Sequence, residues 1–209
     1  MTELVGRVLI ACEFSGIVRD AFIRHGINAI SCDLLPSERL GPHIQGDVIQ
    51  TAFLGGPWDA ILAFPPCTHL AVSGARWFAE KRAEQEEALE FVQRLLDAPI
   101  PLIALENPIG VISTRIRKPD QIIQPWMFGH GETKATCLWL KGLPKLRATD
   151  TVTGRVPRVH HASPGPDRWK ERSRTLPGIA NAMADQWRWM IPAFQERQAE
   201  LRWREEQEL

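Results

Sequence analysis

The stretch Trp58–Gly74 reads WDAILAFPPCTHLAVSG, and it places a cysteine directly after a predicted buried strand. Ala60–Phe64 is a continuous apolar run with the length typical of a strand covered on both faces. Pro65 and Pro66 then end this strand, because proline has no N–H to donate to a neighbouring strand. Open α/β sheets carry their chemistry at the carboxyl ends of the strands, so Cys67 is a candidate nucleophile. The alternative is an inert cysteine packed in the core.

The N-terminal segment has the order of a nucleotide-binding unit. Arg7–Cys12 is a predicted strand, and Gly16 lies in the turn that follows it. Ile17–His25 places its apolar side chains on one helical face, which favours a helix. The next predicted strand, Ile27–Cys32, ends at Asp33. This order favours a cofactor over Gly16 with Asp33 accepting hydrogen bonds from ribose hydroxyls; a helix cap and a solvated aspartate are the alternative.

The middle of the chain predicts two more strands and a helix. Gly46-Asp47-Val48 is typical of the end of a brief third strand, where Asp47 is either a helix cap or an acceptor for a base edge. Phe78–Asp97 carries the apolar stripe of an amphipathic helix. Leu102–Leu105 is a buried strand that delivers Glu106-Asn107-Pro108 at its carboxyl end. Placing a glutamate there is costly unless something uses it, although it could also cap a neighbouring helix.

The last third of the chain contains an edge hairpin, a basic segment and helices. Gln121–Phe128 and Lys134–Leu140 suit an antiparallel hairpin at a sheet edge. Residues 141–174 carry nine Lys or Arg against three Asp or Glu and are broken by prolines and glycines. They form either a surface that contacts phosphates or a polar loop whose charge is balanced by acids elsewhere in the chain. A helix is predicted from Pro177 up to Pro192, followed by a charged helical tail over residues 193–209.

The composition is that of an ordinary globular protein with no excess charge. The chain has 209 residues, 44% of them hydrophobic, and a formal net charge of zero. No apolar run approaches the ~20 residues of a membrane span, and the N-terminus has no signal-peptide pattern. The four cysteines form no CxxC pair, which argues against a zinc site or a disulfide framework. We expect a reduced, cytoplasmic protein with one domain over residues 1–192 and a basic loop-rich insert at 141–176.

Four short motifs and two single aspartates, Asp33 and Asp47, together resemble the C5-cytosine DNA methyltransferase family, particularly its short phage and prophage members. Phe14-Ser15-Gly16 resembles the cofactor loop after the first strand, and Pro65-Pro66-Cys67 resembles the catalytic Pro-Cys loop. Glu106-Asn107-Pro108 is similar to the Glu-Asn motif and begins 39 residues beyond the cysteine. Asn181-Ala182-Met183 is similar to the motif that closes the family's fold. The match is in order and reaches to about Trp189.

The resemblance implies a Rossmann-like methyltransferase fold, with a mostly parallel sheet, an antiparallel hairpin at one edge and helices on both faces. It also implies S-adenosylmethionine as the cofactor and no metal. The residues expected to bind the cofactor are Phe14, Ser15, Gly16, Asp33, Asp47, Pro65 and Asn181. The residues expected to be catalytic are Cys67, Glu106 and Lys134, the last contacting O2 of the base, a role for which Thr136 is the alternative.

The chemistry of the family explains why these residue types are needed together. C5 of cytosine becomes nucleophilic when a thiolate, here from Cys67, adds to C6 of the ring. An acid that is hydrogen-bonded to N3 stabilises the resulting charge, and Glu106 fits this role when it is protonated. Burial at the mouth of an apolar strand raises a carboxyl pKa and so favours that state. The base must be flipped out of a duplex or come from a single strand.

The sequence departs from the family pattern in several places. The first motif keeps one glycine, with Val18 and Arg19 in place of further glycines; Thr68 follows the cysteine, and Ala180 precedes Asn181. The family's large target-recognition region is absent, and only the basic residues 141–174 occupy its place against DNA. We therefore expect short or weak sequence specificity, or a second subunit that supplies it. The same chemistry on a free deoxycytidine nucleotide, and a nucleic-acid-binding module with a decayed cofactor site, are the competing hypotheses.

Overall fold

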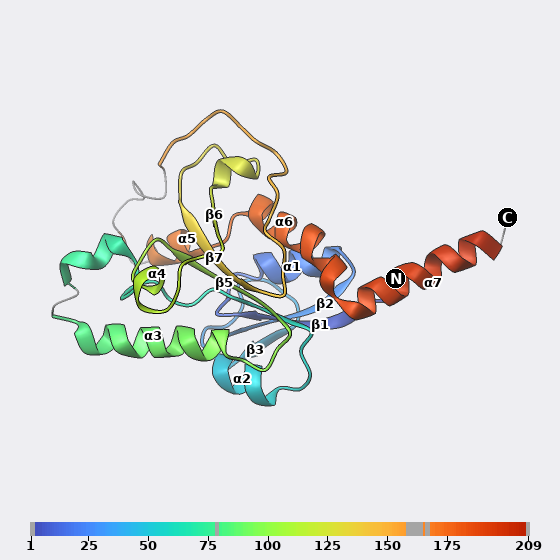
Figure 1. Cartoon of the computed structure of the whole chain (residues 1–209), viewed down its shortest axis with the longest axis horizontal. Coiled ribbons are helices and arrows are strands. Elements are labelled where there is room, and N and C mark those ends of the chain that lie inside the picture. The colour runs from blue at the N-terminus through green and yellow to red at the C-terminus, as the bar shows by residue number, and fades with distance from the viewer. Residues whose placement is uncertain (1–2, 78–79, 158–164, 166–167, 208–209) are drawn as a thin grey trace.

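The computed structural model describes residues 3–77, 80–157, 165 and 168–207, and a seven-stranded sheet runs through its middle (Figure 1). The strand order is β3-β2-β1-β4-β5-β7-β6. The pairs from β3 to β5 are parallel, and β7 runs antiparallel to both β5 and β6. The mixed α/β class with an antiparallel edge is therefore confirmed. The strands are β1 Val5–Ala11, β2 Ile27–Asp33, β3 His43–Gln45, β4 Ala60–Ala63, β5 Leu102–Pro108, β6 Gln121–Ile123 and β7 Thr136–Lys141.

The central strands are buried on both faces, as their continuous apolar sequences predict. Successive side chains of a strand point to opposite faces. In β1, Val8 and Ile10 enter the core on one face, while Leu9 and Ala11 enter the core on the other. All four residues of β4 are buried. Only a sheet that is covered on both sides allows such strands, and this sheet has helices on both faces.

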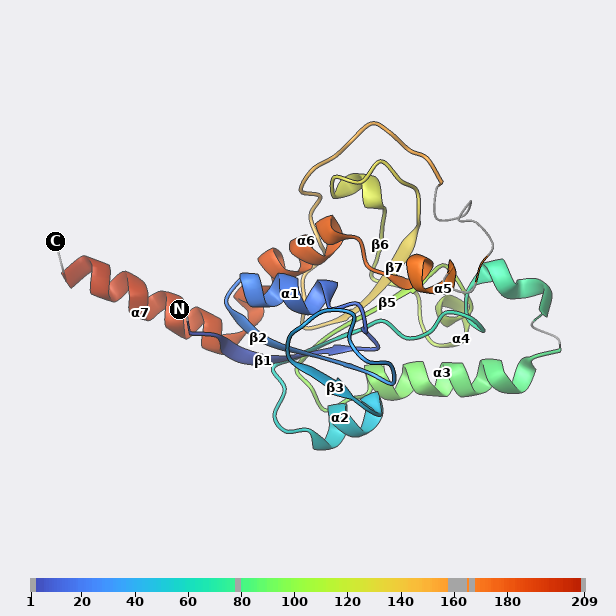
Figure 2. The same ribbon diagram turned by 180° about the vertical axis from the view of Figure 1, so that it is seen from behind.

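Two helices cover each face of the sheet, and one helix extends away from it (Figures 1 and 2). The helices α1 (Ile17–Arg24) and α6 (Pro177–Trp187) pack on the face that holds Val8. The opposite face is covered by α2 (Val48–Leu54) and α3 (Arg82–Leu96). The remaining elements are α4 Ile112–Arg115, α5 Arg168–Ser173, α7 Pro192–Gln207, and the 3-10 helices η1 Val72–Trp77, η2 Pro125–Met127 and η3 Arg188–Met190. No helix of the described ranges is both long and apolar enough to cross a membrane.

The region after β3 corrects the sequence prediction. The third strand ends at Gln45, before Gly46, and Val48 begins helix α2, which the sequence did not predict. Asp47 is its N-cap, because its Oδ1 accepts a hydrogen bond of 2.9 Å from the backbone N–H of Gln50. A side-chain acceptor at this position satisfies one of the N–H groups that a helix start leaves unpaired.

Three further boundaries differ from those predicted. β5 continues through Pro108, so the Glu106-Asn107-Pro108 motif lies within the strand, because β7 pairs alongside it. β6 is short, since Pro125 begins the 3-10 helix η2. The helix predicted from Phe78 begins at Arg82, and residues 78–79 lie outside the described residues.

Candidate active site

The sheet topology brings the predicted catalytic residues to one side of the sheet, the carboxyl edge, where the parallel strands have their carboxyl ends. Because β4 and β5 are parallel neighbours, Cys67 follows β4 at the same edge where Glu106 lies near the end of β5. β7 runs the opposite way, and its first residue, Thr136, pairs with the last residue of β5. Lys134, two residues before Thr136, therefore lies at this edge as well. The antiparallel strand β7 thus brings the cation Lys134 to the carboxyl ends of the parallel strands β4 and β5.

The loop that carries Cys67 is held by a hydrogen bond to the end of β5 and by hydrogen bonds of its own turn. The side-chain amide of Asn107 donates to the carbonyl of Pro65 over 2.8 Å, and both residues are buried. The carbonyl of Cys67 accepts from the backbone N–H groups of Leu70 and Ala71, at 3.1 and 3.0 Å. This turn leaves Cys67 exposed, unlike the buried Cys32 and Cys137.

Gly110 lets the segment after β5 approach this loop closely. The N–H of Val111 donates to the carbonyl of Leu70 over 2.9 Å, and Ala71 forms an antiparallel bridge with Gly110. A Cβ at residue 110 would lie 2.0 Å from that same carbonyl oxygen. Any larger residue would push the Cys67 loop away from β5.

The charges around Cys67 and Glu106 act on both groups. Partial burial of the thiol raises the pKa of Cys67, and the nearby Glu106 carboxyl raises it further, while Lys134 and Arg172 lower it. Burial raises the pKa of Glu106, against the opposing effects of Lys134 and of a hydrogen bond with the Thr136 hydroxyl. The raised pKa of Glu106 favours its protonated form at this edge.

Lys134 is half-buried and held at both ends. Its backbone N–H donates to the side-chain oxygen of Gln124 at 3.0 Å, and its Nζ donates to the carbonyl of Arg172 at 3.0 Å. Arg172 belongs to α5 and was not predicted as a site residue. The only signal for it in the sequence was the high basic content of the segment that contains α5.

The turn between β1 and α1 is compact and contains a buried acid. Gly16 has a φ of 72° and caps α1, a conformation that favours glycine. Glu13 is 5% exposed, and its Oε1 accepts from the Ser15 hydroxyl and from the N–H of Ile17 at 2.8 Å. Its other oxygen is buried without a hydrogen-bond partner, and burial raises the pKa of Glu13. Glu13 was not among the predicted site residues, although its position directly after the first predicted strand was a signal in the sequence.

Arg19 is a buried arginine in the first turn of α1. Its side chain is fully buried and forms an ion pair with Asp20 at 2.8 Å. The guanidinium also donates to the hydroxyls of Ser31 and Ser37, and to the carbonyls of Arg39 and Leu40. Arg19 therefore fastens the loop after β2 against the first turn of α1.

Some of the other predicted cofactor residues lie near the β1–α1 turn, and others do not. Phe14 and Ser15 are buried in the β1–α1 turn, and Asp33 ends β2 at the same edge, where burial raises its pKa. Asp47 caps α2. Asn181 is exposed and accepts a 3.0 Å hydrogen bond from Arg24, in the last turn of α1, whereas Gly16 precedes the first turn. The structure therefore brings together Gly16 and Asp33 but pairs Asn181 with the far end of α1.

The sequence matches no family model and no curated protein, and the similarities found are to solved structures. One is described as a DNA modification methyltransferase encoded within an E. coli prophage, at 12% identity and a TM-score of 0.44, covering 77% of this chain and 56% of that one. Another is the S. pombe Dnmt2 methyltransferase, at 16% identity and a TM-score of 0.42, with 76% and 54% covered. A third is a triple mutant of Spodoptera frugiperda DNMT2, at 15% identity and a TM-score of 0.44, covering 71% of this chain and 55% of that one. This chain spans little more than half the length of these proteins, and the similarity concerns the fold alone.

Proposed function

We propose that this protein transfers a methyl group from S-adenosylmethionine to C5 of cytosine in DNA. The observation that supports this most directly is the pairing of an exposed thiol and a carboxyl with a raised pKa at the ends of two adjacent strands. Cys67 follows β4, Glu106 lies near the end of β5, and Lys134 acts on the charges of both. A nucleophile, an acid and a cation are thus available around one planar ring.

Cys67 supplies the nucleophile in the proposed reaction. Its thiolate adds to C6 of cytosine, and the electron pair of the C5–C6 double bond becomes available at C5. That pair forms the new bond to the methyl carbon, while the electrons of the broken carbon–sulfur bond stay with the cofactor's sulfur. Removal of the C5 proton by a base then restores the double bond and expels the Cys67 thiolate.

Glu106 supplies the acid. Addition of the thiolate to C6 increases electron density on N3 of the ring, and a carboxylic acid that donates a hydrogen bond to N3 stabilises that charge. Because burial raises the pKa of Glu106, its protonated form is favoured before the substrate binds. Lys134 lowers the pKa of Cys67 and thereby favours its thiolate.

The β1–α1 turn and the end of β2 have the chemistry to hold S-adenosylmethionine, which supplies an electrophilic methyl group. Asp33 offers a carboxylate for ribose hydroxyls, and Gly16 keeps the turn compact, because a Cβ there would lie 2.5 Å from the Arg19 guanidinium. The unpartnered oxygen of Glu13 is a further acceptor for an ammonium or hydroxyl group. Phe14 and Pro65 would add apolar contacts. Asn181 was predicted to bind the cofactor, but it hydrogen-bonds to Arg24 at the far end of α1 and has no role in the proposed binding.

DNA is the proposed partner, contacted by the basic residues 141–174. Lys145, Arg147 and Arg155 lie in the described part of this segment, and residues 158–164 and 166–167 lie outside it. Cations on a protein surface favour phosphate binding. The small size of the segment is consistent with short or weak sequence specificity.

Transfer of a radiolabelled methyl group tests this proposal. The purified protein is incubated with S-adenosylmethionine carrying a tritiated methyl group and with DNA, and in a parallel arm with dCMP. We expect label in 5-methylcytosine after digestion of the DNA. Label in another base, or none in DNA at any protein concentration, would contradict the proposal, and label confined to dCMP would transfer the chemistry to the free nucleotide.

A further inference from the structure

Helix α5 (Arg168–Ser173) lies across the edge of the sheet that carries the candidate site. At one point its Trp169 ring contacts Phe14 of the β1–α1 turn, with ring centroids 5.8 Å apart at an angle of 51°. At another, the carbonyl of Arg172 accepts the hydrogen bond from Lys134. One short helix therefore touches both the turn proposed for the cofactor and the cation beside Cys67.

A third contact fastens the end of α5 to the loop after β2. Arg174 donates two hydrogen bonds to the Glu38 carboxylate, at 2.6 and 3.1 Å. The backbone N–H of Glu38 in turn donates to the carbonyl of Phe14 over 2.8 Å. These contacts position α5 against the β1–α1 turn from two directions, so the orientation of Trp169 is determined by the fold.

The surface that α5 presents combines an aromatic ring with cations. Trp169 is 51% exposed even though one side of its ring contacts Phe14. Lys170 places its Nζ 5.7 Å from the centroid of the Trp169 ring. Residues 168–174 contain four Lys or Arg and one acid, Glu171. Single-stranded nucleic acids bind to such surfaces, because every base has a face that stacks on an aromatic ring while cations contact the phosphates.

We propose that α5 is a stacking platform for an unpaired base, and that the DNA substrate is single-stranded. Trp169 stacks on a base next to the target cytosine, and the cations of α5 contact the adjoining phosphates. The inference rests on the proposed function, since it names the form of the DNA on which the same site acts. In a duplex both faces of each base are already covered by its neighbours, so a stacking ring gains a partner only when the strand is unpaired.

Equilibrium binding to fluorescent oligonucleotides tests the platform without requiring catalysis. The full chain carrying Cys67→Ser is titrated against a labelled 20-nucleotide strand and against the same sequence as a blunt duplex, at one salt concentration. We expect the single strand to bind at least about 10-fold tighter. Trp169→Leu should weaken single-strand binding by about 5- to 150-fold, the effect of removing one stacked base, whereas Trp169→Phe should stay within about threefold of the parent.

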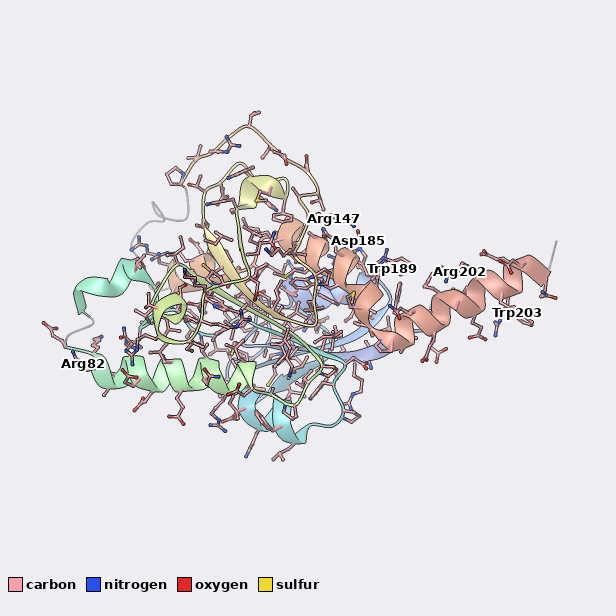
Figure 3. The ribbon with its side chains drawn as sticks, viewed as in Figure 1. Arg82, Arg147, Asp185, Trp189, Arg202 and Trp203 are labelled. Carbon is pink, nitrogen blue, oxygen red and sulfur yellow. The ribbon has the colours of Figure 1, made fainter. Side chains whose placement is uncertain are left out.

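Trp203 provides the matched control. It is 60% exposed on α7, next to Arg202, and Figure 3 shows both on the helix that extends away from the sheet. Trp203→Leu should leave binding unchanged. Three results would each overturn the platform. They are equal effects of Trp169→Leu and Trp169→Phe on binding, a loss of binding with Trp203→Leu as large as that with Trp169→Leu, and equal binding of the duplex and the single strand. If methyl transfer fails while Trp169-dependent binding is observed, the proposed function is contradicted but the role of α5 in binding single strands is supported. Efficient methylation of a duplex by the Trp169→Leu variant would contradict the role of α5 alone.

Discussion

Two cysteines occupy corresponding places at the same edge of the sheet, yet their surroundings are opposite. Cys12 follows β1 and Cys67 follows β4, and these two strands are parallel neighbours. Burial strongly raises the pKa of Cys12, and the negative charges of Asp33 and Asp47 raise it further. Cys67 is exposed, and although burial of its thiol and Glu106 raise its pKa, cations act against that rise.

The difference shows that the end of a parallel strand alone does not make a nucleophile. What distinguishes Cys67 is the antiparallel strand β7, whose start brings Lys134 to this edge, together with α5, which brings Arg172. The groups whose charges shift the pKa of Cys12 are Asp33, Cys32 and Asp47, and each of them raises it. A thiolate is stabilised by adjacent positive charge and destabilised by burial, so the two thiols should differ in every reaction that needs the thiolate.

The largest expected effect comes from exchanging each sulfur for oxygen. Cys67→Ser should lower methyl transfer by about a thousand-fold or more, because covalent addition requires the thiolate. Cys12→Ser should stay within about threefold of the wild type. Initial rates with tritiated S-adenosylmethionine measure both. Comparable losses in the two variants would mean that the comparison between the cysteines is wrong.

The next largest effect is expected at the acid. Glu106→Gln keeps the shape of the side chain but removes the carboxylic proton, so turnover should fall by about 100- to 1,000-fold. Glu90→Gln, on the exposed surface of α3, is the matched control and should leave the rate unchanged. Single-turnover rates separate this loss from weaker DNA binding. A fall of less than about threefold would remove Glu106 from the mechanism.

The raised pKa of Glu106 also predicts how stability depends on pH. A carboxyl whose pKa is higher in the folded state binds more protons when folded, so its favourable contribution is complete below its ordinary pKa and is lost as pH rises through the folded value. Glu106→Gln stays neutral and should lose this dependence. Urea unfolding at pH 5 and pH 8 should show the variant gaining stability relative to wild type as pH rises. A relative loss of stability over that range would contradict the assigned direction of the shift.

The smallest effect is expected from the cation. Lys134→Gln should raise the pKa of Cys67 and slow its alkylation by iodoacetamide at pH 8 several-fold, as followed by peptide mass spectrometry. Lys141→Gln serves as the control, because Lys141 lies at the opposite end of β7. Cys12 should react slowly in every variant. If Cys67 reacts as fast or faster in Lys134→Gln, then Lys134 does not lower the pKa of Cys67.

Much of the fold was predictable because hydrophobic periodicity and strand-ending prolines are local signals. The buried strand before Cys67, the acid near the end of β5 and the antiparallel edge all follow from such patterns. Helix α2 was missed because seven residues contain too little periodicity, and its start depends on the cap by Asp47. The extent of β5 was missed because it depends on pairing with β7, which is remote in the sequence.

The site was predictable only in part for the same reason. Cys67 and Glu106 each follow or end an apolar run, so local sequence marked them. Arg19, Arg172 and Trp169 act through contacts with residues that are distant in the chain, such as the Phe14 ring against Trp169. No local pattern distinguishes a buried arginine that fastens a loop from a solvated one on a helix surface.

Covalent catalysis by Cys67 can be tested with DNA in which 5-fluorocytosine replaces cytosine. Fluorine at C5 prevents the elimination that would release the thiol, so the covalent complex accumulates after methyl transfer. We predict a denaturant-stable protein–DNA adduct that requires S-adenosylmethionine, maps to the peptide containing Cys67 and is absent in Cys67→Ser but present in Cys12→Ser. No adduct with the wild type, or an adduct that persists in Cys67→Ser, would show that Cys67 does not form a covalent bond to cytosine.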